Sequence, residues 1–91
     1  MKISIITVCL NSEKTILANF NSILSQSYKN IEHIIVDGGS NDNTFKYISN
    51  YPNPNKKIFI IKKRGIYNAM NVGIKNATGN FIGILNSDDI L

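Results

Sequence analysis

Short β-branched apolar runs alternate with segments of helical periodicity along the whole of this 91-residue chain. Apolar runs of strand length are typical of buried strands, whereas apolar residues spaced three and four apart form one face of a helix. The predicted strands span residues 3–8, 31–36, 58–61 and 81–85, and the predicted helices span residues 12–26, a short segment around Phe45 and Ile48, and residues 66–77.

This alternation predicts an α/β fold with a parallel sheet. A strand can return to a parallel neighbour only through a crossover of about a dozen residues, and each helical segment supplies one. Residues 31–36 are apolar on both faces apart from Glu32 and His33, as expected for a parallel strand covered on both sides. We therefore expect a Rossmann-like parallel sheet with alternating helices, forming one domain or part of one.

Composition narrows the class of protein. The apolar fraction of 43% and the charged fraction of 18% are those of an ordinary globular chain. No apolar run approaches the ~20 residues that cross a bilayer, and the run after Met1 is too short for a secretory signal. The single Cys9 excludes a disulfide framework and favours a cytoplasmic location, with Cys9 as a core residue. His33, the only histidine, is expected to be structural.

Basic residues concentrate around the third apolar run. Half of the ten basic residues flank residues 58–61: Lys56, Lys57, Lys62, Lys63 and Arg64. Such a cluster could contact nucleic acid, anionic lipid or ligand phosphate, or could only solubilise the strand. Aromatic side chains do not alternate with these basic residues in the way that a single-strand-binding surface requires, so no nucleic-acid partner is expected.

Acidic residues follow the predicted strands. Five of the six do so: Glu13 after the first strand, Asp37 and Asp42 after the second, and Asp88 and Asp89 after the fourth. Because ligands of open α/β sheets bind at the carboxyl ends of the strands, these acids are predicted to gather at one binding edge. Gly38 and Gly39 allow a close backbone approach to a ligand there. The adjacent carboxylates 88–89 suit Mg²⁺ or Mn²⁺ shared with substrate phosphates, although a solvated loop capping the strand is the simpler alternative.

Several alternative functions can be compared with this pattern. The chain lacks the glycine-rich motif of dinucleotide-binding proteins and that of P-loop proteins. A receiver-like signalling domain needs an acidic pair after the first strand, whereas here the pair follows the fourth. A non-catalytic or degenerate nucleotide-binding α/β module remains an open alternative to an enzyme.

Five stretches show an order and spacing that is specific in combination: residues 5–11, 25–32, 36–44, 65–73 and 77–89. Together they resemble the inverting family-two glycosyltransferases of the GT-A nucleotide-diphospho-sugar fold, especially those that build capsule, O-antigen or exopolysaccharide. The resemblance runs across essentially the whole chain. It implies that residues 1–91 form the N-terminal donor-binding part of a truncated GT-A fold, without the acceptor half and its catalytic base.

The resemblance also implies roles for the candidate site residues. The segment from Thr7 to Asn11 and Glu13 would line the base and ribose pocket, and Asp37 would accept a hydrogen bond from a uracil-type base. Asn86-Ser87-Asp88 would occupy the Asp-x-Asp position, with Asp88 as a ligand of Mn²⁺ or Mg²⁺ and Asp89 as an auxiliary ligand.

Asn71 and Arg64 would face the donor phosphates or sugar. This sequence departs from the family pattern at three positions. Asn86 replaces the first aspartate and carries no charge, so a lower metal affinity is expected. Lys63 and Asn68 stand where relatives often have acidic residues.

The activity implied is transfer of a sugar, with inversion, from a UDP-sugar to a hydroxyl of a glycan or lipid-linked acceptor in bacterial surface polysaccharide synthesis. The expected location is the cytoplasm or the inner face of the plasma membrane. Because the acceptor half would be absent, this chain is expected to bind donor only and to be inactive alone. The unpaired fourth strand would favour a homodimer.

Overall fold

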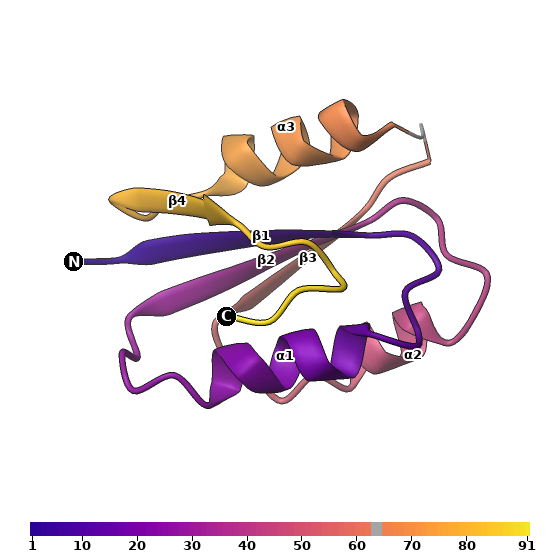
Figure 1. Cartoon of the computed structure of the whole chain (residues 1–91). Helices are drawn as coiled ribbons and strands as arrows, with labels where there is room; N and C mark the ends of the chain where they lie inside the picture. Colours follow the sequence, from indigo (N-terminus) through magenta and orange to yellow (C-terminus); the bar gives the residue numbers. More distant parts are fainter. Residues whose placement is uncertain (63–64) are drawn as a thin grey trace.

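The computed structural model describes residues 1–62 and 65–91 and confirms the predicted alternation of strands and helices. The elements are β1 (Ile3–Cys9), α1 (Ile16–Leu24), β2 (Ile31–Asp37), α2 (Thr44–Ser49), β3 (Lys56–Ile60), α3 (Ile66–Asn76) and β4 (Phe81–Ile84), as labelled in Figure 1. The first helix begins four residues later than predicted, because residues 12–15 form a turn in which the carbonyl of Ser12 accepts the N–H groups of Thr15 and Ile16.

All four strands form one parallel sheet in the order β3-β2-β1-β4. Ile3 of β1 lies opposite Ile31 of β2 on one side and opposite Phe81 of β4 on the other. The chain moves outward from β1 through β2 to β3 and then returns to the other side of β1. The strand order therefore reverses at β1, and ligands of open α/β sheets bind at the carboxyl edge beside such a reversal.

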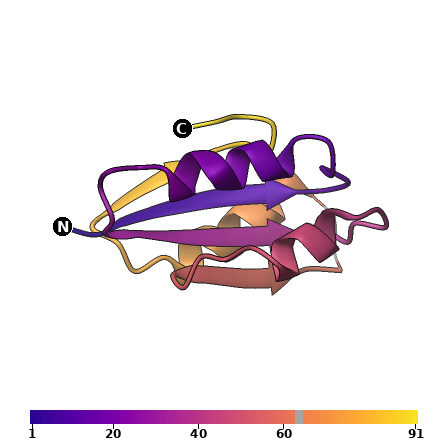
Figure 2. The same cartoon turned by 90° about the horizontal axis from the view of Figure 1, so that it is seen from below.

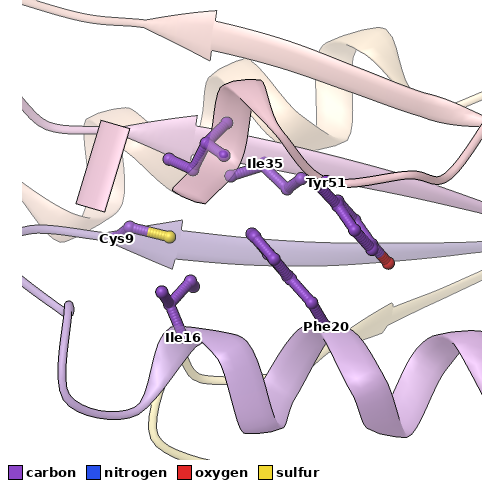
Figure 3. Close-up of a cluster of buried hydrophobic side chains, with 6 residues drawn as sticks. Cys9, Ile16, Phe20, Ile35 and Tyr51 are labelled. Atoms are coloured by element: carbon purple, nitrogen blue, oxygen red, sulfur yellow. The ribbon is translucent and has the colours of Figure 1, made fainter. Parts of the chain in front are cut away.

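Helices cover both faces of the sheet. Figure 1 shows α1 and α2 on one face and α3 on the other, and Figure 2 shows the same layers from below. Cys9, Ile16, Phe20, Ile35 and Tyr51 are among the buried side chains under α1 and α2 (Figure 3). A second cluster, Ile6, Ile34, Val36 and Ala69, lies under α3. No helix among the described residues is long and apolar enough to span a membrane.

Helix α3 approaches β1 closely at Gly73. A Cβ atom at this position would lie 2.5 Å from Cγ2 of Ile6, well inside van der Waals contact. Ile6 is completely buried and cannot move away without disturbing the core. The absence of a side chain at position 73 therefore sets the distance between α3 and the sheet.

Replacing Gly73 with alanine is expected to lower the free energy of unfolding by about 1–2 kcal/mol, because overpacking outweighs the roughly 1 kcal/mol gained in helix propensity. Urea unfolding should show a lower midpoint with an unchanged slope. Lys75→Ala, at an exposed position of the same helix, serves as the control. A Gly73→Ala protein more stable than the parent would contradict the close approach.

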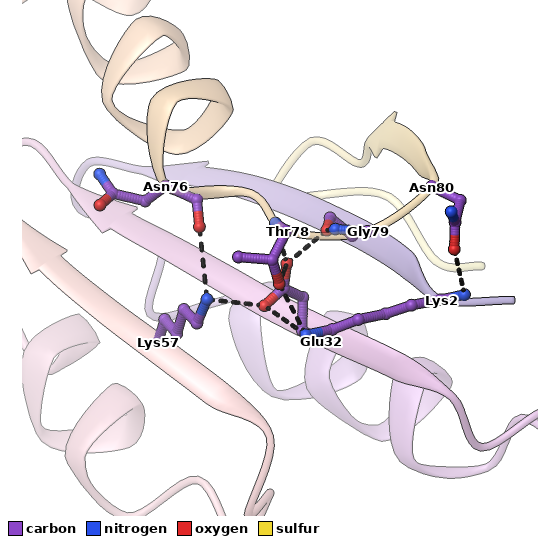
Figure 4. Close-up of polar contacts among 8 residues, drawn as sticks. Lys2, Glu32, Lys57, Asn76, Thr78, Gly79 and Asn80 are labelled. Atoms are coloured by element: carbon purple, nitrogen blue, oxygen red, sulfur yellow. Dashed lines mark hydrogen bonds and ion pairs between the residues drawn. The ribbon is translucent and has the colours of Figure 1, made fainter.

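A buried carboxylate fixes the amino edge of the sheet. Glu32 of β2 is only 2% exposed, and its Oε2 accepts hydrogen bonds from the Ser4 hydroxyl of β1 and from the N–H (2.7 Å) and hydroxyl (3.0 Å) of Thr78. Its Oε1 lies 2.8 Å from Nζ of Lys57 and 3.4 Å from Nζ of Lys2. Figure 4 shows these contacts converging on Glu32.

The Glu32 contacts explain how β4 reaches its place. Burial alone would raise the pKa of Glu32, but the hydrogen bonds from Lys57, Ser4 and Thr78 outweigh it and hold the pKa well below its usual range. Thr78 lies in the connection between α3 and β4, and the neighbouring Gly79 donates its N–H to Ser4 Oγ at 2.8 Å. The ionised carboxylate therefore anchors the crossover that places β4 beside β1.

The outer edge of β4 is not paired with any described strand. Its side chains Phe81, Ile82 and Ile84 are 56%, 47% and 47% exposed. An edge of this kind can pair with another chain, so the homodimer expected from the sequence stays a prediction.

Candidate functional site

Two loops at the carboxyl edge of the sheet are locked together by hydrogen bonds. After β1, the N–H of Asn11 donates to Ser40 Oγ at 2.9 Å, and the Asn11 side-chain oxygen accepts the N–H of Asn41 at 2.9 Å. The N–H of Ser12 donates to Thr44 Oγ1 at 2.7 Å. Asn11 has φ 51°, a left-handed conformation that asparagine tolerates better than most residues. The loops after β1 and β2 therefore form one surface.

Asp37 ends β2 within this surface. Its side chain is almost fully buried, and Oδ1 accepts hydrogen bonds from the hydroxyl (2.6 Å) and N–H (3.2 Å) of Ser40. The next residue, Gly38, donates its N–H to the carbonyl of Cys9 at 2.8 Å. Gly39 has φ +97°, a conformation that favours glycine. The glycine pair thus turns the chain at the place where Asp37 is held.

A hollow of about 230 Å³ opens beside Gly38. It is lined by Val8, Cys9, Leu10, Gly38, Ile61, Gly65 and Ala69, which are mainly apolar. Burial and the nearby charge of Asp37 raise the pKa of the Cys9 thiol to about 12, so Cys9 is not a nucleophile at neutral pH. This agrees with the core role expected from the sequence.

The loop after β4 joins the same surface at the reversal of strand order. Ser87 Oγ lies 2.9 Å from Ser12 Oγ, and the N–H of Asp89 donates to the carbonyl of Asn86 at 2.9 Å, closing a turn. Asp88 and Asp89 are exposed, and neither carboxylate makes a hydrogen bond or ion pair with a described residue. Two free carboxylates therefore stand beside the β1 loop.

The side chains of this turn supply only part of the ligands that a hard divalent cation needs. Within residues 1–62 and 65–91, no group of three or more His, Cys, Asp or Glu side chains could hold a metal. Asp88 and Asp89 offer oxygen ligands of the kind that Mg²⁺ and Mn²⁺ prefer. One or two carboxylates suffice when substrate phosphates supply further ligands, so a shared site is chemically consistent with these residues.

Thr7 requires a correction. The family resemblance implied that it lines a ligand pocket, but its side chain is completely buried and its hydroxyl lies 2.8 Å from Nε2 of His33. Side chains alternate between the two faces of β1, which directs Thr7 into the core rather than toward the edge. His33 is equally buried, and its Nδ1 lies 2.9 Å from the Tyr51 hydroxyl, so its expected structural role agrees with its surroundings.

The remaining candidates are placed unevenly. The N–H of Glu13 lies 3.4 Å from Asp42 Oδ2, which brings Glu13 to the locked loops. Asn71 lies exposed midway along α3, on the other face of the sheet from the acidic turn, which contacts α1. The structure does not bring Asn71 together with that turn. Arg64 lies outside the described residues.

One residue at the site was missed from the sequence. Asn19 of α1 is completely buried, and its Nδ2 donates to the carbonyls of Asn86 and Asp89, both at 3.0 Å. It interrupts the buried stripe of α1, in which Ile16, Phe20 and Ile23 are apolar. A polar residue on the apolar face of a helix was the signal available, because buried polar groups require partners.

Comparisons with known proteins agree with this geometry. The WfaP protein of Escherichia coli, named as a UDP-Glc:α-D-GlcNAc-diphosphoundecaprenol β-1,3-glucosyltransferase, is 41% identical over 90 residues, which cover 96% of this chain and 35% of that protein. An uncharacterised glycosyltransferase of Haemophilus influenzae is 37% identical over 92 residues, covering 98% of this chain and 37% of its own length. The chain thus spans about a third of the length of these curated relatives.

Solved structures show the same fold. Residues 1–349 of Staphylococcus aureus TarS in complex with UDP superpose with a TM-score of 0.92 at 35% identity, over 99% of this chain and 28% of that one. A mannosyltransferase of Pyrobaculum calidifontis in complex with GDP-Man and Mn²⁺ shares the fold, with a TM-score of 0.86 at 23% identity, over 98% of this chain and 28% of that one. These neighbours confirm the predicted GT-A fold.

The family model described as glycosyl transferase family 2 matches residues 4–91, which is nearly the whole chain. The resemblance noted in the sequence is thereby confirmed. The locked loops, the acidic turn after β4 and the parallel sheet that carries both are the elements of the chain over which this match extends. The chain belongs to glycosyl transferase family 2.

Proposed function

We propose that this chain binds a nucleotide-diphospho-sugar, a UDP-sugar in the first instance, together with Mn²⁺ or Mg²⁺ at the carboxyl edge of the sheet. The observation that supports this most is the union of three loops at the reversal of strand order, with Asp37 at the start of one loop and the exposed carboxylates of Asp88 and Asp89 in another. UDP in the TarS complex and the UDP-sugar in the name of WfaP favour this donor class.

The nucleotide end of the donor is assigned to the loops after β1 and β2. The hollow of about 230 Å³ beside Gly38 is smaller than the ~300–1,000 Å³ of pockets that enclose a whole ligand, and it suits one part of a ligand such as a base. Asp37 would accept a hydrogen bond from a base N–H, since an ionised carboxylate is an acceptor only. The backbone at Gly38 and Gly39 leaves room for this approach, and Asn11 and Glu13 would contact the ribose.

The diphosphate end is assigned to the turn after β4. Asp88 would be the principal ligand of the cation, with Asp89 auxiliary and with Asn86 and Ser87 beside the ribose and phosphates. When bound, the cation would act as a Lewis acid that offsets the charge developing on the departing nucleoside diphosphate. Because Asn86 is neutral, the chain itself would hold the metal weakly and would depend on the donor phosphates for further ligands.

The activity of the whole protein is proposed as transfer with inversion. A base would remove the proton of an acceptor hydroxyl, the oxygen would bond to C1 of the sugar, and the bond from C1 to the phosphate oxygen would break. The acceptor is proposed to be a glycan or lipid-linked glycan of a bacterial surface polysaccharide, used in the cytoplasm or at the inner face of the membrane. None of the described residues is assigned as the base, so this chain alone is proposed to bind donor without transferring it.

Calorimetric titration of UDP into the 91-residue chain, with and without Mn²⁺, tests the donor site. We expect Mn²⁺ to strengthen UDP binding and Asp88→Ala to weaken the binding measured in Mn²⁺ by about tenfold or more, as expected for loss of a charged ligand worth 1.4 kcal/mol or more. Asp88→Ala should bind metal-free UDP like the parent, whereas Asp37→Asn should weaken binding in both buffers.

The two variants therefore separate the two ends of the site. Binding of UDP that ignores both Mn²⁺ and Asp88→Ala would contradict the metal site. Absence of UDP binding under all conditions would favour a non-catalytic or degenerate α/β module. Transfer of radiolabelled sugar by the isolated chain would contradict the donor-only role.

A further inference from the structure

A row of polar side chains joins α1 to the segment that follows β4. Asn19 and Ser22 of α1, and Gln26 just beyond it, are spaced three and four residues apart and therefore lie on one face. All three contact main-chain atoms of residues 86–91. Nδ2 of Asn19 donates to two carbonyls, Oγ of Ser22 accepts the N–H of Leu91 (3.0 Å), and Nε2 of Gln26 donates to the Leu91 carbonyl (3.5 Å). Figures 1 and 2 show this segment folded back along α1.

Asn19 makes the most buried of these contacts. Its side chain is 0% exposed, and both hydrogens of Nδ2 are used, one by the carbonyl of Asn86 and one by the carbonyl of Asp89. The opposite orientation of the amide would point an acceptor at two acceptors, so the hydrogen bonds define how the side chain lies. Its Oδ1 is buried without a hydrogen-bond partner among the described residues. Burying an amide with one unsatisfied polar atom costs free energy, so packing alone does not explain Asn19 at this position.

The two carbonyls bound by Asn19 flank Asp88. Asn86 and Asp89 are also joined to each other by the N–H of Asp89, so the turn is closed and then attached to the helix. Ser87, between them in sequence, also contacts Ser12, with 2.9 Å between the two hydroxyl oxygens. The main chain on both sides of Asp88 is therefore fixed, while the Asp88 carboxylate itself stays exposed and without a described partner.

We propose that Asn19 is a positioning residue that holds the 86–89 turn so that Asp88 presents its carboxylate toward the loops after β1 and β2. Asn19 does not touch the donor or the cation. It acts through the main chain of the turn, and helix α1 provides the rigid support. This proposal rests on the proposed function for its consequence in binding, but the anchoring of the turn can be measured without any ligand.

The test uses Asn19→Leu in the full 91-residue chain, which keeps the branched shape and the number of heavy atoms of the side chain and removes both N–H donors. Amide hydrogen exchange, followed by NMR, should show the Asp89 N–H exchanging about tenfold faster or more, as expected when two hydrogen bonds of the turn are lost. Asn21→Leu is the matched control, because Asn21 is exposed on the same helix. It should leave the exchange of Asp89 unchanged.

Calorimetry supplies the second measurement. The gain in UDP affinity produced by Mn²⁺ should fall by about tenfold in Asn19→Leu, while metal-free UDP binding stays as in the parent. A purely structural role would weaken both equally or neither. Asn19→Ala repeats the test with a smaller side chain, should the leucine variant fail to fold.

Each outcome bears on one proposal. An Asp89 N–H that exchanges at the parental rate in a folded Asn19 variant overturns the anchoring, and an unchanged Mn²⁺-dependent gain overturns the positioning role. If the parent chain binds no UDP, the proposed function fails, and the exchange comparison still decides whether Asn19 holds the turn.

Discussion

Replacing Glu32 with alanine is expected to lower the free energy of unfolding by about 4 kcal/mol, the range found when one partner of a buried ion pair is removed. Glu32 accepts hydrogen bonds from Ser4 and Thr78 and pairs with Lys57 and Lys2. Its removal leaves the Thr78 N–H and the Ser4 hydroxyl without their acceptor in a site that water barely reaches. The strands β1 and β3 and the α3–β4 connection lose a common partner at once.

Urea unfolding of Glu32→Ala, compared with Glu13→Ala, measures this effect. The Glu13 carboxylate makes no hydrogen bond or ion pair with a described residue, so its removal should change stability by less than about 0.5 kcal/mol. Hydrogen exchange should also show β4 losing protection before β1 and β2, because the crossover to β4 depends on Glu32. A loss below about 1 kcal/mol would mean that water replaces these contacts readily.

Acidification from about pH 7 to about pH 5 is expected to reduce stability by about 2 kcal/mol through His33 alone. Burial lowers the pKa of His33 to about 4 from an ordinary value of 6.5, because the charged imidazolium cannot be solvated among Thr7, Phe20 and Tyr51. The unfolded chain therefore binds a proton in this window that the folded chain does not. The contribution of neutral His33 to stability is fully present above its unfolded pKa and is lost as the pH falls toward its folded pKa.

In the range from about pH 7 to about pH 5, the effect of His33 can be separated from that of other groups in this chain. His33 is its only histidine, and Glu32, whose pKa is also lowered by folding, loses its contribution only below its ordinary value of 4.5. The NMR signal of the His33 ring should titrate near pH 4 in the folded protein. In His33→Gln the slope of stability against pH should disappear between about pH 7 and about pH 5, whatever the stability of that variant at neutral pH. A slope equal to that of the parent would contradict the assignment.

Periodicity predicted the fold well because each element forms from residues close in sequence. The runs at 3–8 and 31–36 are β-branched and apolar, and both became central strands. The stripe of Ile16, Phe20 and Ile23 became the buried face of α1. The helix start at Ile16 was missed, because the turn before it is stabilised by Thr44, 32 residues away. Local patterns contain no information about such a partner.

The candidate site was predicted less completely, for a related reason. Asp37, Asp88 and Asp89 lie at the carboxyl edge as predicted, because acids that follow parallel strands must reach one edge. Thr7 was misplaced, because its direction depends on the pleat of β1 and on the need of buried His33 for a hydrogen-bond partner. Asn19 was missed, because its two acceptors lie 67 and 70 residues further along the chain.

The order of apolar runs, helical stripes and strand-end acids was sufficient to predict a parallel α/β sheet and the edge that carries the candidate site, while five motif stretches, by their resemblance to a known family, indicated the family. Only the tertiary structure decided that β4 lies beside β1, that Glu32 anchors the crossover leading there, and that Asn19 holds the acidic turn against α1. The physical reason is that strand patterns arise from neighbours along the chain, whereas buried polar groups find their partners across it. Such pairings depend on which atoms packing brings within hydrogen-bonding distance.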